Sequence, residues 1–190
     1  MSTLEVNTIT PQSGTTLTLG GSGDTIQVAS GVTNNLGITE ADQWRLTTSF
    51  TGDASPIASN LERVDTSGQG YLGTGMTQSS GIFTFPSTGY WLVTYQITFY
   101  AAADTNRVIG RLWATTDNST YNEVANAITH ANTSGNDTTS TSFCTSIIDV
   151  TDTSQVKVRF DVDQINAGNE VNGNSGKNLT SFTFIRLGDT

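Results

Sequence analysis

Apolar and polar residues alternate with a period of two along much of this chain, and this pattern predicts β-strands rather than helices. The clearest run lies between residues 91 and 100, where Trp91, Val93, Tyr95, Ile97 and Phe99 fall on one face. Residues between them are mostly polar, as expected for a strand with one face toward a core and the other toward water. The alternation therefore predicts a long central strand with one buried face.

The same pattern, bounded by turn residues, recurs through the rest of the chain after residue 38. We expect strands at 43–50, 61–64, 81–85, 90–101, 107–114, 123–128, 140–150, 155–162 and 179–187. Polar segments at 132–137 and 166–177 are expected to be solvent-facing loops. Many short strands at regular spacing, with no credible helix, predict an all-β sandwich or jelly roll.

Residues 1–38 differ from the remainder. Short alternating segments at 4–9, 16–19 and 25–28 are separated by glycine-rich turns, and every Trp, Tyr and Phe lies further along the chain. So few large side chains cannot bury enough surface to offset the entropy of ordering the segment alone. We therefore expect two regions, an extended β-rich segment over 1–38 whose identical copies intertwine, and a compact domain over 39–190.

Composition and charge exclude several classes of function. The formal net charge is −9, with only 8 Lys and Arg residues, and there is no basic run that could neutralise phosphates. Nucleic-acid binding is therefore not expected, and no stretch approaches the ~20 apolar residues of a membrane-spanning helix. No signal peptide is visible at Met1, so we expect a chain made and assembled in a cytoplasm.

A motif in the middle of the chain resembles the C1q/TNF-like jelly-roll family. Residues 81–93 place Gly81, Phe83, Pro86 and Gly89 at the spacing that precedes the long central strand of that family. The ending, 181–188, is similar to the family's terminal strand. The resemblance implies a C1q/TNF-like jelly-roll sandwich that assembles as a homotrimer.

The N-terminal segment is similar to the connectors of tailed-phage fibre-like proteins, on residues 4–9, 13–20 and 22–26. That resemblance implies a structural virion protein: a trimeric fibre, spike or capsid decoration on the virion surface. Residues 1–38 would attach it to other virion proteins of the capsid or tail. The domain at 39–190 would project and could contact a glycan or protein of the host surface. The alternative is a non-viral carbohydrate-binding or adhesive module.

Candidate metal ligands and nucleophiles are few, and we expect neither a metal site nor a cofactor. His130 is the sole histidine and cannot by itself form a histidine-rich zinc site, although three copies could meet on an axis. Asp161 and Asp163 lie in an oxygen-rich stretch, but its spacing does not match an EF-hand loop, so solvated carboxylates are expected. Cys144 is expected to be a small buried apolar residue.

No arrangement of residues predicts catalysis. Glycoside hydrolysis needs two carboxyl groups that face each other across a sugar, and the sequence pairs none of Glu40, Glu62, Glu123 and Glu170. We therefore expect no enzyme activity. Three tryptophans could stack on sugars: Trp91 and Trp113 lie in strand patterns and are expected in the core, and Trp44 could pack at a subunit interface.

Overall fold

The computed structural model describes residues 8–11, 13–15, 17–25, 37–102, 105–131, 138–163 and 169–190. Contacts divide the chain into two units, 1–36 and 37–190. In the first unit the amide of Asp24 donates to the carbonyl oxygen of Gly21 (3.1 Å) in a turn. The described residues 17–19 form no strand, although the sequence predicted a β segment at 16–19. The expected segments at 4–9 and 25–28 lie mostly outside the described residues.

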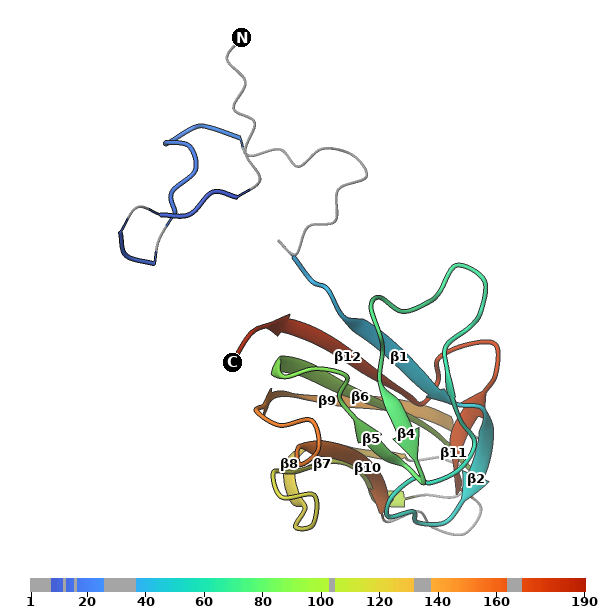
Figure 1. The fold of residues 1–190 in the computed structure, drawn as a ribbon. Helices are drawn as coiled ribbons and strands as arrows, with labels where there is room; N and C mark the ends of the chain where they lie inside the picture. Colours follow the sequence, from blue (N-terminus) through green and yellow to red (C-terminus); the bar gives the residue numbers. More distant parts are fainter. Residues whose placement is uncertain are drawn as a thin grey trace. The chain divides into compact units, whose positions relative to one another are not determined.

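The second unit, which we call the knob (residues 37–190), is built from two antiparallel β-sheets (Figure 1). One sheet has seven strands: β2 (Thr48–Thr51), β11 (Asn169–Asn174), β6 (Gly89–Ala101), β12 (Ser181–Gly188), β1 (Ala41–Leu46), β3 (Leu61–Arg63) and β9 (Thr138–Val150). The other has five: β4 (Thr77–Ser79), β5 (Ile82–Thr84), β10 (Lys157–Asp163), β7 (Thr105–Thr115) and β8 (Asn122–Ala131).

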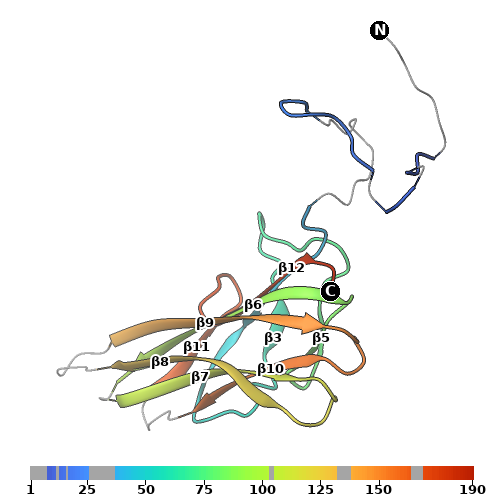
Figure 2. The same cartoon turned by 90° about the vertical axis from the view of Figure 1, so that its left-hand side faces the viewer.

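Strand β6 organises the seven-stranded sheet. It pairs with β9 along its whole length on one side and with β12 and then β11 on the other. Figure 2 shows the two layers, with β9 at the border of one and β8 at the border of the other. These border strands lie together, and the hydroxyls of Thr129 in β8 and Ser140 in β9 are 2.8 Å apart.

All nine expected strands are present, with differences at three places. The expected strand 43–50 is split at Thr47, where the chain stops pairing with β3 and begins to pair with β11. Strand β4 was not expected. Strand β11 was expected to be a loop, because its Asn- and Gly-rich sequence has low strand propensity. It is a strand because β6 and β2 supply backbone partners on both of its sides.

An aromatic cluster fills the space between the sheets. Phe160 of β10 lies 4.3 Å from Phe182 of β12, between ring centroids, and 5.2 Å from Tyr95 of β6. Phe83 of β5 lies 5.5 Å from Phe160 and 5.2 Å from Phe184. All five side chains are buried. These rings join the central strands of both sheets, so the alternation that predicted a buried face is confirmed.

The turn before β6 has the geometry that its motif predicts. Gly89 has a φ of 132°, which L side chains rarely adopt, and a Cβ there would clash with the carbonyl oxygen of Gly188. The indole of Trp91 donates to the carbonyl oxygen of Ser87 (3.1 Å) and closes the turn. Glycine is therefore required where β6 begins beside the end of β12.

We predict that Phe160→Ala lowers the free energy of unfolding by about 3–5 kcal/mol, because the cavity would lie among several aromatic rings. Urea denaturation followed by tryptophan fluorescence measures this loss. Ile128→Ala is the control, since Ile128 is 54% exposed, and it should change stability by less than about 0.5 kcal/mol. Similar losses in the two variants would show that this cluster is not the centre of the core.

Candidate interaction face of the seven-stranded sheet

The outward side chains of β9, β6, β12 and β1 form a face whose rows are set by strand register. Leu92 of β6 pairs with Ile147 of β9 on one side and with Ile185 of β12 on the other, and Ala41 of β1 pairs with Ile185. These four residues therefore make one apolar row across four strands. We call it the apolar row, and the whole surface the outer face.

A second row, two residues further along each strand, is polar and uncharged. It consists of Thr145, Thr94, Thr183 and Gln43. The hydroxyls of Thr94 and Thr145 are 3.3 Å apart, and the Thr145 hydroxyl also donates to the carbonyl oxygen of Val93 (3.0 Å). Because these two hydroxyls already have hydrogen-bond partners within the sheet, another protein could cover them without leaving them unsatisfied.

Charge is nearly absent from the outer face. The charged side chains on its rows are Asp149, at the end of β9, and Arg45, which is fully buried. The Arg45 guanidinium donates to Glu62, Asp65 and Thr66, so its charge is neutralised and covered. By contrast, large apolar side chains are exposed at the β9 border. Apolar side chains in water beside uncharged rows are typical of the centre of a protein–protein interface.

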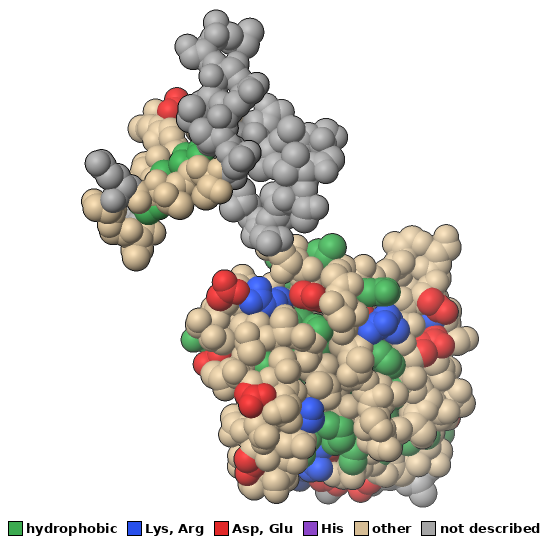
Figure 3. Space-filling model, viewed as in Figure 1, with side chains coloured by type: hydrophobic (Ala, Val, Ile, Leu, Met, Phe, Trp, Pro, Cys, Tyr) green, Lys and Arg blue, Asp and Glu red, His purple; other side chains and the backbone are tan. Residues whose placement is uncertain are grey.

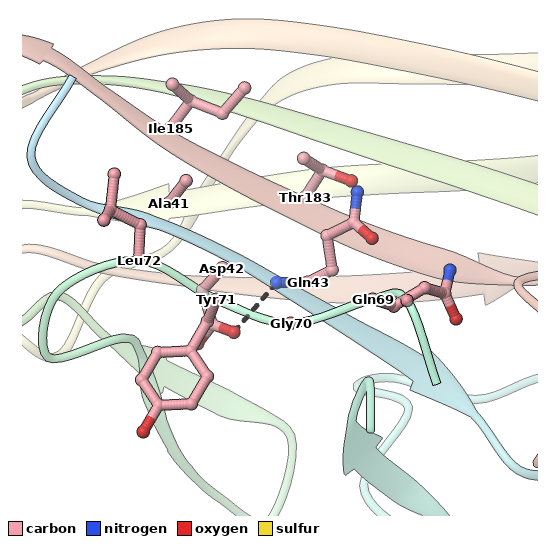
Figure 4. A pocket seen from close by; sticks show the side chains of 10 residues that line it. Ala41, Asp42, Gln43, Gln69, Gly70, Tyr71, Leu72, Thr183 and Ile185 are labelled. Atoms are coloured by element: carbon pink, nitrogen blue, oxygen red, sulfur yellow. Dashed lines mark hydrogen bonds between the residues drawn. The ribbon is translucent and has the colours of Figure 1, made fainter. Parts of the chain in front are cut away.

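An open groove of about 420 Å³ runs along the opposite border of the outer face (Figure 4). Its floor is made by Ala41 and Gln43 of β1 and by Thr183 and Ile185 of β12, and its wall is the loop 68–72. The wall is joined to β1 through Leu72, which exchanges two backbone hydrogen bonds with Ala41 (2.8 and 3.1 Å). Leu72 itself is 48% exposed, so the rim of the groove is apolar.

Two carboxylates of the chain around β1 hold residues 74–76, the segment that directly follows this wall. Asp42 is buried, and its Oδ2 accepts hydrogen bonds from the Met76 amide (2.7 Å), the Trp44 indole (3.0 Å) and the Arg63 guanidinium (3.1 Å). Glu40 accepts from the amides of Thr74 (2.9 Å) and Gly75 (3.2 Å). The wall is therefore tied to β1 at Leu72, and the chain that follows it is fixed by these carboxylates.

The outward face of the five-stranded sheet is different, because charges of both signs follow its strands. Its charged side chains include Arg111, Glu123, Lys157, Arg159, Asp161 and Asp163. Arg111 bridges Glu123 (3.3 Å) and Asp163 (2.6 Å). Acidic and basic side chains are also interspersed on the side of the knob seen in Figure 3, where the apolar patches between them are small. A mixed charged surface of this kind is typical of a face that stays in water.

The expectation that the Asp161 carboxylate is solvated was wrong, because this side chain is buried. Its Oδ2 accepts from the Ser55 hydroxyl (2.6 Å), and its Oδ1 lies 3.9 Å from Nε of Arg159. Removal of the carboxyl group from water raises its pKa, against the opposing effects of Ser55, Arg159 and Arg111. Asp163 is half-buried against Arg111.

The three tryptophan side chains lie in different environments, and not all of these match the expectation. Trp91 is in the core, as predicted. Trp113 is on the outward face of the five-stranded sheet, with the Arg159 guanidinium 5.3 Å from its ring centroid, so the prediction of core packing was wrong. Trp44 packs edge-on against Phe83 (5.6 Å) between the sheets, not on the outer face. Alternation shows that a strand has two different faces, but by itself it did not show which of the two faces of the strand with Trp113 points to the core.

Cys144 and His130 have the places that their sequence context predicts. Cys144 is buried on the inner side of β9, and burial raises the pKa of its thiol to about 11. His130 is exposed near the end of β8. Within the described parts of the chain, no group of three or more His, Cys, Asp or Glu side chains is placed to hold a metal ion. The described residues also contain no helix long and apolar enough to cross a membrane.

Comparison with known proteins identifies the fold. No protein-family profile matches the chain, and no curated protein sequence matches it. Among solved structures, the knob is similar to murine APRIL, with a TM-score of 0.56 and 13% identity over 78% of this chain and 98% of that chain. It is also similar to Eiger TNF from S. frugiperda, with a TM-score of 0.55 and 15% identity over 79% of this chain and 93% of that one. The knob therefore has the C1q/TNF-like jelly-roll fold, as the motif at 81–93 predicted.

The sequence did not point to the groove or its wall. The wall residues, Gly68 to Leu72, lie between two expected strands with no alternation of their own. One signal was available, which is the glycine spacing at Gly73 and Gly75. Both have positive φ, and a Cβ on Gly75 would lie 2.9 Å from Oδ2 of Asp42. Such glycines mark close backbone approach, but the partner is visible only in the fold.

We predict that Asp161 makes stability depend on pH. Its pKa is higher in the folded than in the unfolded chain, so its contribution is fully present below the unfolded pKa and is lost as pH rises through the folded pKa. The stability of the native protein relative to Asp161→Asn should therefore fall as pH increases from acid to neutral. Urea denaturation at a series of pH values measures the difference.

Ser55→Ala is the matched variant, because it removes a hydrogen bond that favours the Asp161 carboxylate. It should move the same pH dependence to higher pH. Parallel pH profiles for native protein and Asp161→Asn would contradict this account of Asp161.

Proposed function

We propose that this chain is a non-enzymatic structural protein of a tailed-phage particle, a homotrimeric fibre, spike or capsid decoration exposed on the virion. In this proposal residues 1–38 attach the trimer to capsid or tail proteins, and the knob projects into solvent, where it could contact the host surface. One observation carries the trimer: the knob has an outer face with exposed apolar side chains and little charge, in a chain with a formal charge of −9. Trimers are also typical of this fold.

The two faces of the knob support the division of roles. The outward face of the five-stranded sheet has internally paired charges and suits permanent contact with water. The outer face of the seven-stranded sheet has almost no charge to lose on burial, so its desolvation costs little. A trimer that buries the outer face would present the charged faces outward, with a formal charge of about −27, three times that of one chain.

The virion role is supported by the resemblance of residues 4–26 to phage-fibre connectors. A segment of this composition suits attachment, because its few apolar side chains are exposed in the single chain and a partner could bury them. In the described part, Ile9, Leu17 and Leu19 are 51%, 43% and 54% exposed. Identical copies or a particle protein could cover them.

Oligomeric state tests the trimer. We predict a mass near 60 kDa by light scattering, three times the 20.1 kDa of one chain. Ile147→Asp, on the outer face, should reduce this mass toward that of one chain, because the buried carboxylate would be unpaired. Ile128→Asp is the matched control, since Ile128 is 54% exposed and Ile147 58%, but Ile128 faces outward from the five-stranded sheet. A native mass of about 20 kDa would overturn the trimer.

Particle association tests the virion role. We predict that antibodies against the knob label purified phage particles, and that a chain lacking residues 1–38 no longer co-sediments with them. A knob that is absent from particles but binds sugars saturably on a glycan array would instead favour the carbohydrate-binding alternative. The partly exposed Trp113, stacked with Arg159, is the tryptophan that such binding would involve.

A further inference from the structure

Arg159 of β10 lies between two aromatic rings on the outward face of the five-stranded sheet. Its guanidinium carbon is 5.3 Å from the ring centroid of Trp113 and 4.6 Å from that of Tyr121, and its side chain is 24% exposed. Its ionic partner among the described residues is Asp161, whose Oδ1 lies 3.9 Å from Nε, too far for a hydrogen bond. Arg159 is therefore a fixed cation that makes no hydrogen bond to the described part of the chain.

Arg63 of β3 provides a direct comparison, because it also lies between two rings. Its guanidinium carbon is 5.3 Å from the centroid of Trp44 and 4.5 Å from that of Tyr71. This guanidinium donates to Oδ2 of Asp42 (3.1 Å) and to a backbone carbonyl oxygen. The rings hold the two arginines alike, but the described residues supply hydrogen-bond acceptors only to Arg63. Arg159 is thus the arginine of the pair that is available to an acceptor outside the chain.

Both rings beside Arg159 are positioned by the fold. Trp113 of β7 is paired with Arg159 in the strand register. Tyr121 directly precedes β8 and follows a turn in which the Asp117 carboxylate accepts a hydrogen bond from the Thr120 amide (2.7 Å). This hydrogen bond, with others in the turn, lowers the pKa of Asp117 to about 2, so the carboxylate that closes the turn is ionised at neutral pH. Groups held in place in this way lose little entropy when a ligand binds.

The five-stranded sheet also differs from the rest of the chain in charge. Strands β4, β5, β7, β8 and β10 carry four of the eight Lys and Arg residues but only three of the 17 Asp and Glu residues. The remainder of the chain therefore holds nearly all of the net negative charge. An anionic group that approaches the knob meets the least repulsion at this sheet.

We infer that Arg159, with Trp113 and Tyr121, binds a carboxylate-bearing sugar of a host-surface polysaccharide. The terminal nitrogens of the guanidinium donate to the sugar carboxylate, and the two rings provide apolar surface beside the sugar ring. Glu123, the register partner of Trp113 in β8, accepts hydrogen bonds from sugar hydroxyls. This inference rests on the host contact in the proposed function, and it names the site and the ligand of that contact.

A single carboxylate suits this site better than a phosphate group or a nucleic acid. Glu123, Asp161 and Asp163 lie on the same face and would repel a dianion more strongly than a monoanion. A polyanion needs several available cations, whereas Arg111 already bridges Glu123 and Asp163. A sugar brings hydroxyl donors that these acidic side chains accept, so the mixture of charges on this face matches an acidic sugar.

A glycan array tests the ligand with the full-length protein. The array carries oligosaccharides that contain uronic or sialic acids, each beside its neutral methyl ester. We expect saturable binding to acidic members and binding about tenfold weaker, or less, to the matched esters, because esterification removes the charge-assisted pair. Binding to no acidic member, or equal binding to acids and esters, would overturn the inference.

Arg159→Gln tests the site with the acidic saccharide that binds best. This variant should weaken binding about tenfold or more, because it removes the charge and the planar donor pair. Lys177→Gln is the matched control, since it makes the same charge change at an exposed position outside the five-stranded sheet, and its affinity should stay within about twofold. Equal affinities of native protein and Arg159→Gln would show that this arginine does not bind the sugar.

Urea denaturation checks that each variant is folded. If Arg159→Gln is not, Trp113→Phe decides, because it reduces the ring beside the sugar and should weaken binding severalfold; unchanged affinity would overturn the site. The virion role is judged separately by co-sedimentation. A chain that sediments with particles through residues 1–38 but binds no acidic sugar keeps the virion role and loses this inference.

Discussion

Aromatic side chains packed between the two sheets determine which residues of β12 face the core and which face outward. Phe182 and Phe184 of β12 pack against Phe83 and Phe160 of the opposite sheet. Since side chains alternate along a strand, burial of these two phenylalanines places Thr183 and Ile185 on the outer face. The core contact and the candidate interface are therefore two consequences of one register. A shift of one residue in the register of β12 would turn Phe182 and Phe184 outward and Thr183 and Ile185 toward the core.

The two faces of the sandwich differ in charge for a reason that local sequence does not show. Strands β7, β8 and β10 carry their charges on outward positions, where Arg111, Glu123 and Asp163 pair with one another. Strands β6, β9 and β12 carry threonines and apolar residues on theirs. Each strand alone looks amphipathic or nearly so. Only their assembly into separate sheets gathers the charges on one side and leaves the other side suited to burial.

Buried carboxylates are used in two ways. Oδ2 of Asp42 accepts hydrogen bonds from Trp44 of β1, Arg63 of β3 and Met76 in the segment after the groove wall, so its charge is well compensated. Asp161 has one short hydrogen bond and a more distant arginine, and these do not offset its removal from water, which raises its pKa. The carboxylate beside the groove thus has three hydrogen-bond donors, whereas the opposite face includes a carboxylate whose charge is poorly compensated.

By itself the sequence determined that the chain is all-β and where its long strands lie, and the motif with Pro86 and Gly89 resembled the entry to the central strand of a C1q/TNF-like jelly roll. These features depend on alternation and turn geometry, which are local. It did not determine that residues 169–174 form a strand, that Trp113 faces outward or that Asp161 is buried. It also did not reveal the groove beside β1. Those features depend on which strands become neighbours, because partners far apart in the chain supply the hydrogen bonds, the cover and the charges. Only the tertiary structure brings those partners together.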